Sequence, residues 1–245
     1  MKGIADPHTQ SSTEILPALE EILSVFRHHL GNSVNALKVT LDVLEQNFDS
    51  FDEDKKKEYL RRASGILERQ QVMLEAMKSY SHTNVNEHRA VDFLPFWEQW
   101  LDAAKERIEK ERVTLTHRVE TGPCVFSGDP LALRTALNEI LGNALEAMEG
   151  AQDRQIELGA ERQDDEILIS IKDSGCGIRE EDISKAFIPL FTTKPGRKGL
   201  GLSIALKLLA QMGGRLEVGP LSGTGALFRV CLNAGGGNHE KALQD

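Results

Sequence analysis

Cysteine is scarce in this sequence of 245 residues, which contains three: Cys124, Cys176 and Cys231. The number is odd, and no two of them form a CxxC pair or show the spacing of metal ligands. A disulfide framework and a thiolate metal site are therefore excluded, and a reducing compartment is favoured. We expect a cytoplasmic protein.

Long apolar runs and a positive charge excess are also missing. No run approaches the roughly 18 residues that indicate a membrane span, and the polar start MKGIADPHTQ lacks the apolar centre of a signal peptide. The formal net charge is -9, whereas binding to nucleic-acid phosphates needs clustered Lys and Arg. We expect no membrane span in this chain and no nucleic-acid partner.

The first part of the chain has a long helical pattern. Apolar positions from Leu19 to Phe48 recur at alternating steps of three and four, which predicts a helix of about nine turns. A break follows in which Ser50 and Glu53 form a candidate capping box. The second stripe consists of Leu60, Ala63, Leu67, Gln70, Leu74 and Met77. The sequence therefore predicts a helical hairpin over residues 14–80, after an N-terminal tail at 1–13.

A hairpin with one apolar stripe on each helix leaves part of both stripes exposed. Two hairpins can bury these surfaces as a four-helix bundle, so we expect a homodimer. The alternative is that the hairpin packs onto the rest of its own chain. Residues 81–90 are polar and aperiodic, which indicates an interdomain linker.

Beyond the linker, the pattern changes to mixed helices and strands. Amphipathic residues around 95–111 predict a helix, and Asp129-Pro130 is a cap followed by a first-turn proline. Strand-like runs lie at 113–119, 155–158, 166–172, 215–218 and 226–232. We predict an α/β sandwich over residues 91–233, with helices on one face of a mixed sheet, followed by a tail at 234–245. The whole chain is then of the α+β class.

Glu139 and Asn143 lie four residues apart on an otherwise apolar helix, so their side chains can point into one cavity. A neutral amide oxygen is a good Mg²⁺ ligand, and a carboxylate beside it can orient a nucleophile or accept a proton. Taken alone, the pair also fits two exposed polar residues on the shoulder of a helix.

Asp173 ends a predicted strand and enters a turn in which Gly175 and Gly177 let the backbone approach a flat ligand. A carboxylate at that point can accept the amino hydrogens of adenine. The same Asp-Ser-Gly sequence is also common in ordinary turns.

A loop with a basic middle leads into Gly199-Leu-Gly201-Leu and an apolar helix. Glycines at a helix N-terminus expose N–H groups that bind phosphate with help from the helix dipole. Lys194, Arg197 and Lys198 add positive charge, and the loop has the makings of a lid over a triphosphate. Together with the motifs before it and Gly223-Thr-Gly225 after it, this loop indicates a pocket for a nucleotide and its metal.

At about residues 90–232, these motifs resemble the N, G1, F/G2 and G3 segments of the GHKL ATPase superfamily. The segments NALEAM, DSGCGI, FTTKPGRKGLGLSIA and GTGALF are similar to those of bacterial sensor histidine kinases of two-component systems. The resemblance implies a Bergerat fold that binds ATP and Mg²⁺. It implies Asn143 for Mg²⁺, Asp173 for adenine, Gly175 and Gly177 for the shape of the pocket, and Gly199 and Gly201 for the phosphates. Further candidate nucleotide-binding residues in these segments are Thr193, Lys194, Leu200, Leu202 and Thr224.

The same family carries a phospho-acceptor histidine on the first helix of a dimerising hairpin, where this chain has His28 and His29. At 100° per residue, His28 points about 170° away from the apolar stripe, Asn32 about 150° and His29 roughly 90°. An acceptor must be reachable and needs an unprotonated ring nitrogen, which histidine has near neutral pH. We assign His28 as the acceptor, with His29 as the alternative. Without the ATPase domain, both would be interpreted as solvated helix residues.

In that family the acceptor is usually followed by Glu or Asp as a base. Thr or Asn four positions after the acceptor positions water for dephosphorylation of the response regulator, and a proline often comes next. Asn32 matches this pattern, whereas His29 replaces the acid and Ser33 replaces the proline. The base is then His29 or Glu139, or autophosphorylation is slow and the protein works mainly as a phosphatase.

The sequence therefore predicts a kinase that transfers the γ-phosphoryl group of ATP to His28. The group then passes to an aspartate of a response-regulator receiver domain on another chain, because no receiver-like pattern remains in this one. Three alternatives stay open: an ATP-driven conformational machine in which Glu139 activates water, a kinase-deficient phosphatase or adaptor, and a serine/threonine kinase of the same superfamily.

Overall fold

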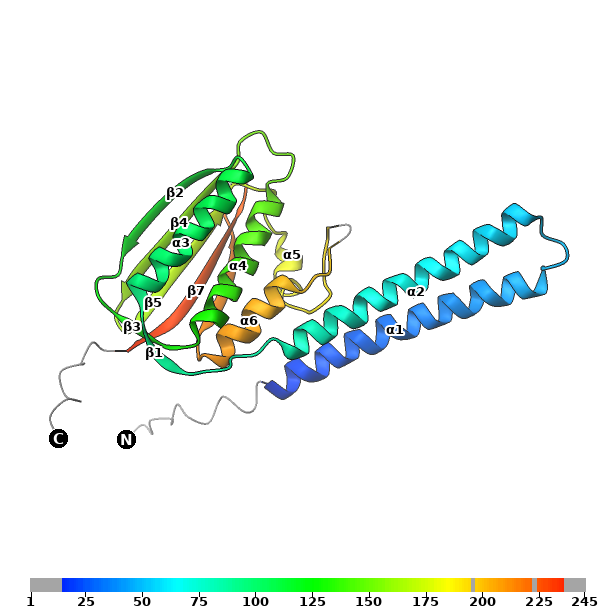
Figure 1. Cartoon of the computed structure of the whole chain (residues 1–245), viewed down its shortest axis with the longest axis horizontal. Helices are drawn as coiled ribbons and strands as arrows, with labels where there is room; N and C mark the ends of the chain where they lie inside the picture. The colour runs from blue at the N-terminus through cyan, green and yellow to red at the C-terminus, as the bar shows by residue number, and fades with distance from the viewer. Residues whose placement is uncertain (1–14, 195–196, 222–223, 236–245) are drawn as a thin grey trace. The chain divides into compact units, whose positions relative to one another are not determined.

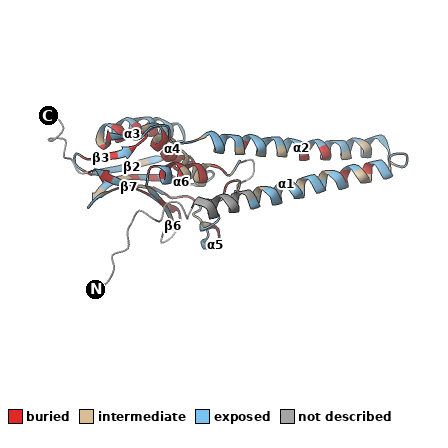
Figure 2. Cartoon of the chain, turned by 90° about the horizontal axis from the view of Figure 1, so that it is seen from below, coloured by how far each residue is buried: buried red, intermediate tan, exposed pale blue. Residues whose placement is uncertain are grey.

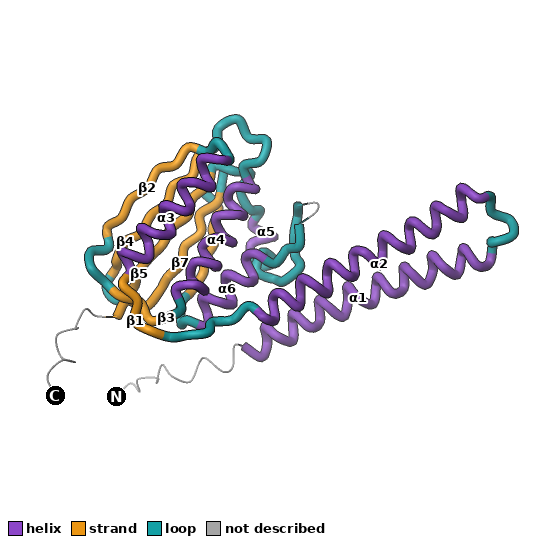
Figure 3. The backbone as a smooth tube through the Cα atoms, viewed as in Figure 1, coloured by secondary structure: helices purple, strands orange, loops and turns teal. Residues whose placement is uncertain are grey.

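The computed structural model describes residues 15–194, 197–221 and 224–235, without the side chains of residues 15–23, 25, 29 and 220. The chain divides into two compact units, residues 1–78 and 79–245. One is helical and the other combines helices with a sheet (Figure 3), so the predicted α+β class is confirmed. The tail predicted at 1–13 lies outside the described residues, as does the tail at 234–245 except for its first two residues.

The helical unit is an antiparallel hairpin of α1 (Ile15–Gln46) and α2 (Glu53–His82) (Figure 1). The predicted capping box at Ser50 is wrong. Asp52 accepts a hydrogen bond from the Lys55 N–H at 2.7 Å, whereas the Ser50 hydroxyl donates back to the Asn47 carbonyl at 2.9 Å. Asp52 stands directly before the first helical residue, where a cap is needed, and Ser50 still belongs to the turn that closes α1.

The hairpin leaves large apolar side chains exposed. Leu44, Ala63 and Ile66 are buried, and Gln70 Nε2 donates to Ser33 Oγ at 2.5 Å across the two helices. Figure 2 shows exposed residues along most of both helices. Among the described side chains of this unit, the large apolar residues that are exposed are Val34, Val39, Leu41, Phe48, Leu60, Leu67, Val72 and Leu74. The contacts within one hairpin therefore cover only part of its apolar surface.

The second unit is a two-layer sandwich. Its helices are α3 (Phe93–Lys110), α4 (Pro130–Ala147), the short α5 (Glu180–Ile183) and α6 (Gly201–Gln211). Its strands are β1 (Arg89–Asp92), β2 (Thr114–Glu120), β3 (Val125–Gly128), β4 (Gln155–Gln163), β5 (Glu166–Asp173), β6 (Arg215–Pro220) and β7 (Ala226–Gly235). The strands run in the order β1-β3-β7-β5-β4-β2, with β6 also paired to β7. Only β2 and β4 pair in parallel among the pairs of described strands, so the sheet is mixed, as predicted.

Helices α3, α4 and α6 cover one face of the sheet (Figures 1 and 3). Along β4, exposed and buried residues alternate, because successive side chains point to opposite faces and only one face is covered. Trp97 and Trp100 of α3 are fully buried, with ring centroids 5.1 Å apart. The indole of Trp100 donates to Asn138 Oδ1 at 3.0 Å, which ties α3 to α4. This packing fixes α4, the helix that carries Glu139 and Asn143.

Within the second unit, backbone N–H groups of the segment before β1 donate hydrogen bonds to side chains. Val85 N–H donates to Gln211 Oε1 at 2.9 Å, and Asn86 N–H donates to Asp129 Oδ2 at 3.0 Å. Asp129 also caps α4, as predicted, through the N–H groups of Leu131 and Ala132. Burial by itself would raise the pKa of Asp129, but these backbone donors together lower it. Within the described part of the chain, no helix has the length and apolar character needed to cross a membrane.

Candidate functional site

A cavity of about 760 Å³ opens in the second unit, between α4, the end of β5, the loop after α5 and the start of α6. Most of the candidate nucleotide-binding residues line it. They are Glu139, Asn143, Asp173, Gly177, Thr193, Lys194, Gly199, Leu200, Gly201 and Leu202. Segments up to about 60 positions apart in sequence therefore meet in one place, as expected for a ligand site in a concave pocket.

Glu139 and Asn143 face the start of α6. A Cβ atom at Gly201 would lie 2.8 Å from Glu139 Oε2 and 3.2 Å from Asn143 Nδ2, so any larger residue would displace these side chains. Burial raises the pKa of Glu139, Arg107 of α3 opposes the rise, and Glu146 adds to it. A carboxyl group with a raised pKa is a better proton acceptor near neutral pH than an ordinary one.

Asp173 lies at the end of β5 and is 2% exposed. Its Oδ1 accepts the Gly175 N–H at 2.8 Å. Burial raises the pKa of Asp173, and the N–H groups of Gly175 and Ala226 and the Lys194 ammonium oppose the rise. Gly175 itself does not line the cavity: a Cβ atom there would lie 2.6 Å from the Ala147 carbonyl, so glycine is what lets this turn pack against the end of α4.

Two buried polar atoms at the cavity lack a well-formed hydrogen bond within the described structure: Asn143 Nδ2 and Asp173 Oδ2. Buried polar groups in folded proteins are nearly always paired, and each exception needs an explanation. Both residues line the same cavity. A ligand with complementary donors and acceptors would satisfy them, so these two atoms mark the polar recognition points of the site.

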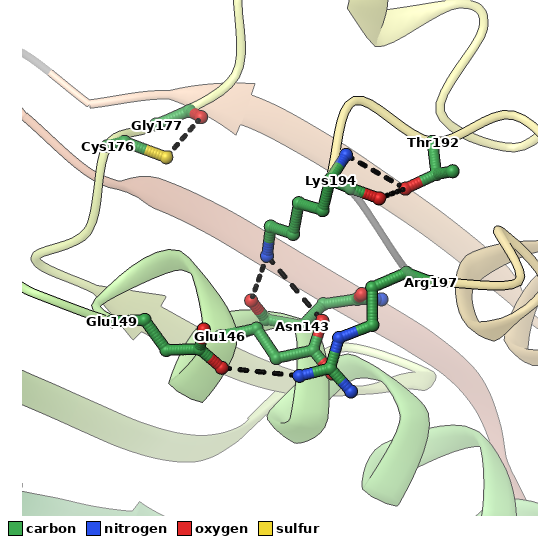
Figure 4. A network of polar contacts seen from close by, with 8 residues as sticks. All are labelled: Asn143, Glu146, Glu149, Cys176, Gly177, Thr192, Lys194 and Arg197. Carbon is green, nitrogen blue, oxygen red and sulfur yellow. Dashed lines mark hydrogen bonds and ion pairs between the residues drawn. The ribbon is translucent and has the colours of Figure 1, made fainter.

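The loop between α5 and α6 brings positive charge to the cavity. Lys194 and Arg197 extend toward the end of α4, where they meet Asn143 and Glu146 of the helix and Glu149 just after it (Figure 4). Helix α6 begins at Gly201, and no side chain caps it at Leu200. Its N-terminus is therefore open to an anionic group on the cavity side.

Three features of the site differ from the sequence assignment or add to it. Thr224 is exposed and is not among the residues that line the cavity. Arg107 lines it from α3, which no motif could indicate, because its place depends on the packing of α3 against α4. Glu146 also lines it. It stands three residues after Asn143 on the same helix face, so helical spacing alone could have found it.

The candidate acceptor lies in the helical unit. His28 and Asn32 are both exposed, as the helical geometry predicted. Asn32 Nδ2 lies 3.0 Å from His28 Nε2. Which of the two nitrogens donates in this contact depends on the tautomer of the ring. The side chain of His29 lies outside the described residues.

Residues 128–235 match the family model described as histidine kinase-, DNA gyrase B- and HSP90-like ATPase. This part of the chain is similar to the ATPase domains of that family. The match supports the predicted ATP cofactor, and the cavity, which lies within the matched range for most of its lining, is the candidate nucleotide site. The matched range contains the four nucleotide motifs but not the hairpin.

Curated relatives of this chain include sensor kinases. The C4-dicarboxylate transport sensor protein DctB of Pseudomonas aeruginosa is 28% identical over 223 residues, covering 90% of this chain and 36% of the relative. The signal transduction histidine-protein kinase AtoS of Escherichia coli is 26% identical over 222 residues, covering 91% of this chain and 36% of the relative. The resemblance to two-component sensor histidine kinases is confirmed. The chain spans about a third of the length of these relatives.

Solved structures share the fold. The catalytic domain of histidine kinase ThkA has a TM-score of 0.54 and 24% identity, covering 60% of this chain and 95% of that one. The structure of ThkA in complex with response regulator protein TrrA has a TM-score of 0.57 and 21% identity, covering 90% of this chain and 63% of that one. The two-unit architecture, hairpin followed by sandwich, is thus one that kinase structures adopt.

Proposed function

We propose that this chain is the kinase core of a two-component sensor, which transfers the γ-phosphoryl group of ATP to His28 and then to an aspartate of a response regulator. The observation that carries the proposal is that an exposed histidine, beside the amide of Asn32, shares a chain with a region similar to ATPase domains. Relatives named as histidine kinases align over both units, which supports this function over an ATP-driven conformational machine.

The chemistry follows from the groups present. His28 Nε2 forms a bond to the γ-phosphorus, the bond from that phosphorus to the β–γ bridging oxygen breaks, and the electron pair leaves with ADP. The Nδ1 proton then passes to a base, either Glu139 or His29. In the second transfer a regulator carboxylate forms a bond to the phosphorus, the N–P bond breaks, and the ring takes up a proton. Asp173 would accept the adenine amino hydrogens, and the open N-terminus of α6 would hold phosphate.

The residues present also fit Mg²⁺. Asn143 lines the cavity with a buried amide whose Nδ2 has no partner among the described residues, so its oxygen can turn toward a cation. No described cluster of three or more His, Cys, Asp or Glu residues could hold a metal, which suits an ion that keeps waters and substrate phosphates as ligands. When bound, Mg²⁺ would offset the charge that develops on the phosphates.

The partners belong to the same proposal. The large apolar residues that are exposed in the described part of the hairpin support a homodimer through a four-helix bundle. A receiver domain would dock near His28, by analogy with the solved kinase whose structure includes a response regulator. Such a core would work in the cytoplasm, where ATP and receiver domains are found.

Labelling with ATP that carries labelled γ-phosphate tests the proposal. The unmodified chain should take up acid-labile label, and His28→Ala should take up none while it still binds ATP. Undiminished acid-labile label in His28→Ala would refute the assignment. Label that disappears in His29→Ala but not in His28→Ala would make His29 the acceptor, and release of free phosphate without labelled protein would favour the conformational machine.

The same assay identifies the base. If Glu139 is the base, Glu139→Gln should slow labelling by about a hundredfold or more while ATP binding is retained. The rate in the unmodified chain should then rise as pH increases through the raised pKa of Glu139, because only the ionised carboxylate accepts a proton. If His29→Ala slows labelling and Glu139→Gln does not, the base is His29 of the hairpin.

A second activity, dephosphorylation of the regulator, is favoured by Asn32. Its exposed amide stands next to the acceptor ring and can orient water once the ring has given up its phosphoryl group. Asn32→Ala should reduce the dephosphorylation of a phosphorylated receiver while labelling of His28 continues. Equal rates of dephosphorylation with and without Asn32 would exclude this role.

A further inference from the structure

Two of the cations in the loop before α6, Lys194 and Arg197, are paired with carboxylates at the end of α4 and just after it. Arg197 Nη1 lies 2.9 Å from Glu146 Oε1, and Arg197 Nη2 lies 3.2 Å from Glu149 Oε1. Lys194 Nζ lies 3.7 Å from Glu146 Oε2 and donates to the backbone oxygen of Asn143 at 3.4 Å. Glu146 thus gives one carboxylate oxygen to each cation, as Figure 4 shows.

Glu146 occupies an unusual place for a carboxylate. It lies in the last turn of α4, which ends at Ala147, and negative charge is unfavourable at the C-terminus of a helix. Its side chain is 22% exposed, whereas that of Glu149 is 67% exposed. Lys194 and Arg197 therefore compensate a partly buried charge that the helix itself disfavours.

The same cations line the nucleotide cavity together with Glu146 and Asn143. A polyphosphate in this cavity needs positive charge, and Lys194 and Arg197 supply it from the loop. The Glu146 carboxylate has the same sign as the phosphates and already holds both cations. Carboxylate and phosphate therefore compete for one pair of positive groups.

We propose that Glu146 is a positioning residue that sets the nucleotide affinity of this site, by holding Lys194 and Arg197 until a polyphosphate takes them over. The proposal rests on the proposed function only in that the cavity binds ATP. The free energy of ATP binding is then the favourable free energy of pairing the two cations with phosphate, reduced by the free energy lost when their ion pairs with Glu146 break. Adenosine has no phosphate, so it does not compete with Glu146 for Lys194 and Arg197.

Titration calorimetry on the full chain, with ATP, adenosine and inorganic tripolyphosphate as separate ligands, tests this. Glu146→Gln keeps the size of the side chain and removes its charge. It should lower the dissociation constants of ATP and tripolyphosphate about three- to tenfold, since two partly exposed ion pairs no longer compete. The affinity for adenosine should not change. Glu149→Gln is the matched control: it removes one exposed pair and should change ATP affinity less than about twofold.

A second background separates competition from a structural effect. In a Lys194→Gln/Arg197→Gln chain, adding Glu146→Gln should no longer tighten ATP binding, because the carboxylate has no cation left to withhold. Unchanged or weaker ATP binding by Glu146→Gln alone would overturn the proposal. So would equal tightening of adenosine, which would indicate a change in pocket shape, or a loss of Mg²⁺-dependent binding, which would make Glu146 a metal ligand.

These are binding measurements, so the two proposals fail separately. If the chain binds ATP but never forms phosphohistidine, the proposed kinase function is refuted, and the proposed role of Glu146 still stands. If Glu146→Gln does not change the affinity for ATP, the proposed competition is refuted, and the proposed kinase function still stands.

Discussion

The two units differ in how completely each buries its own apolar residues. The sandwich unit encloses its largest side chains, with Phe93, Trp97 and Trp100 all at 0% exposure. In the hairpin, Leu67 and Leu74 remain 51% and 54% exposed. The sandwich therefore covers its own apolar core, whereas the hairpin leaves apolar surface that the proposed dimer would bury. The candidate acceptor, His28, is on the unit that we propose to dimerise, and the candidate nucleotide site is on the other unit.

The largest expected effect comes from breaking the self-sufficient core. Trp100→Ala should lower the free energy of unfolding of the sandwich by about 3–5 kcal/mol, because it leaves a cavity and strands the Asn138 amide that now accepts the indole N–H. Chemical denaturation, followed by near-ultraviolet circular dichroism, measures it. Trp100→Phe, which keeps a large ring but loses the hydrogen bond, should cost clearly less. Equal costs for the two variants would assign the effect to the hydrogen bond alone.

An intermediate effect should follow from changing the exposed stripe of the hairpin. Leu67→Gln with Leu74→Gln removes apolar surface that we propose is buried between two copies, so the dimer dissociation constant should rise about a hundredfold. Sedimentation equilibrium measures it, and Glu68→Gln, beside the stripe, is the control. ATP binding should persist, since the nucleotide cavity lies in the other unit. A chain that is monomeric before any substitution would refute the dimer.

The smallest expected effect on stability concerns the carboxylate of Asp173, which the sandwich buries at the candidate nucleotide site. Burial raises the pKa of Asp173, so the folded state binds a proton more tightly than the unfolded state does. Between the ordinary carboxyl pKa of roughly 4 and the raised value, stability therefore falls as pH rises, and the cost is full above that window. Asp173→Asn should stabilise the ligand-free sandwich by about 0.5–2 kcal/mol at neutral pH and abolish ATP binding.

The pH dependence of this gain is its check. The difference in unfolding free energy between Asp173→Asn and the unmodified chain should disappear when the pH is brought below the unfolded carboxyl pKa, where both side chains are neutral. A gain that is equal at every pH would mean that the substitution improves packing and does not relieve a buried charge.

Sequence reasoning succeeded where the signal is local. The two long helices, α4 with its Asp129-Pro130 start, and strands β4, β5 and β7 follow from periodicity and capping residues that lie close together in sequence. It missed β1 and β3, because four-residue strands have little periodicity of their own and form through pairing with distant partners. Part of β1 falls in the segment predicted as a linker. The cap of α2 was misplaced by two residues, since Ser50 and Asp52 are both acceptable capping residues.

The sequence by itself determined the class of the fold, the order of the nucleotide motifs and the exposed helix face that carries His28 and Asn32. Each of these depends on residue types and on spacings within one element. Only the tertiary structure decided that Gly201 abuts Glu139, that Arg107 joins the site from α3, and that Lys194 and Arg197 are held by Glu146. These contacts join residues about 30 to 60 positions apart, and they exist only because the buried packing of α3, α4 and α6 on one sheet fixes where each chain segment returns.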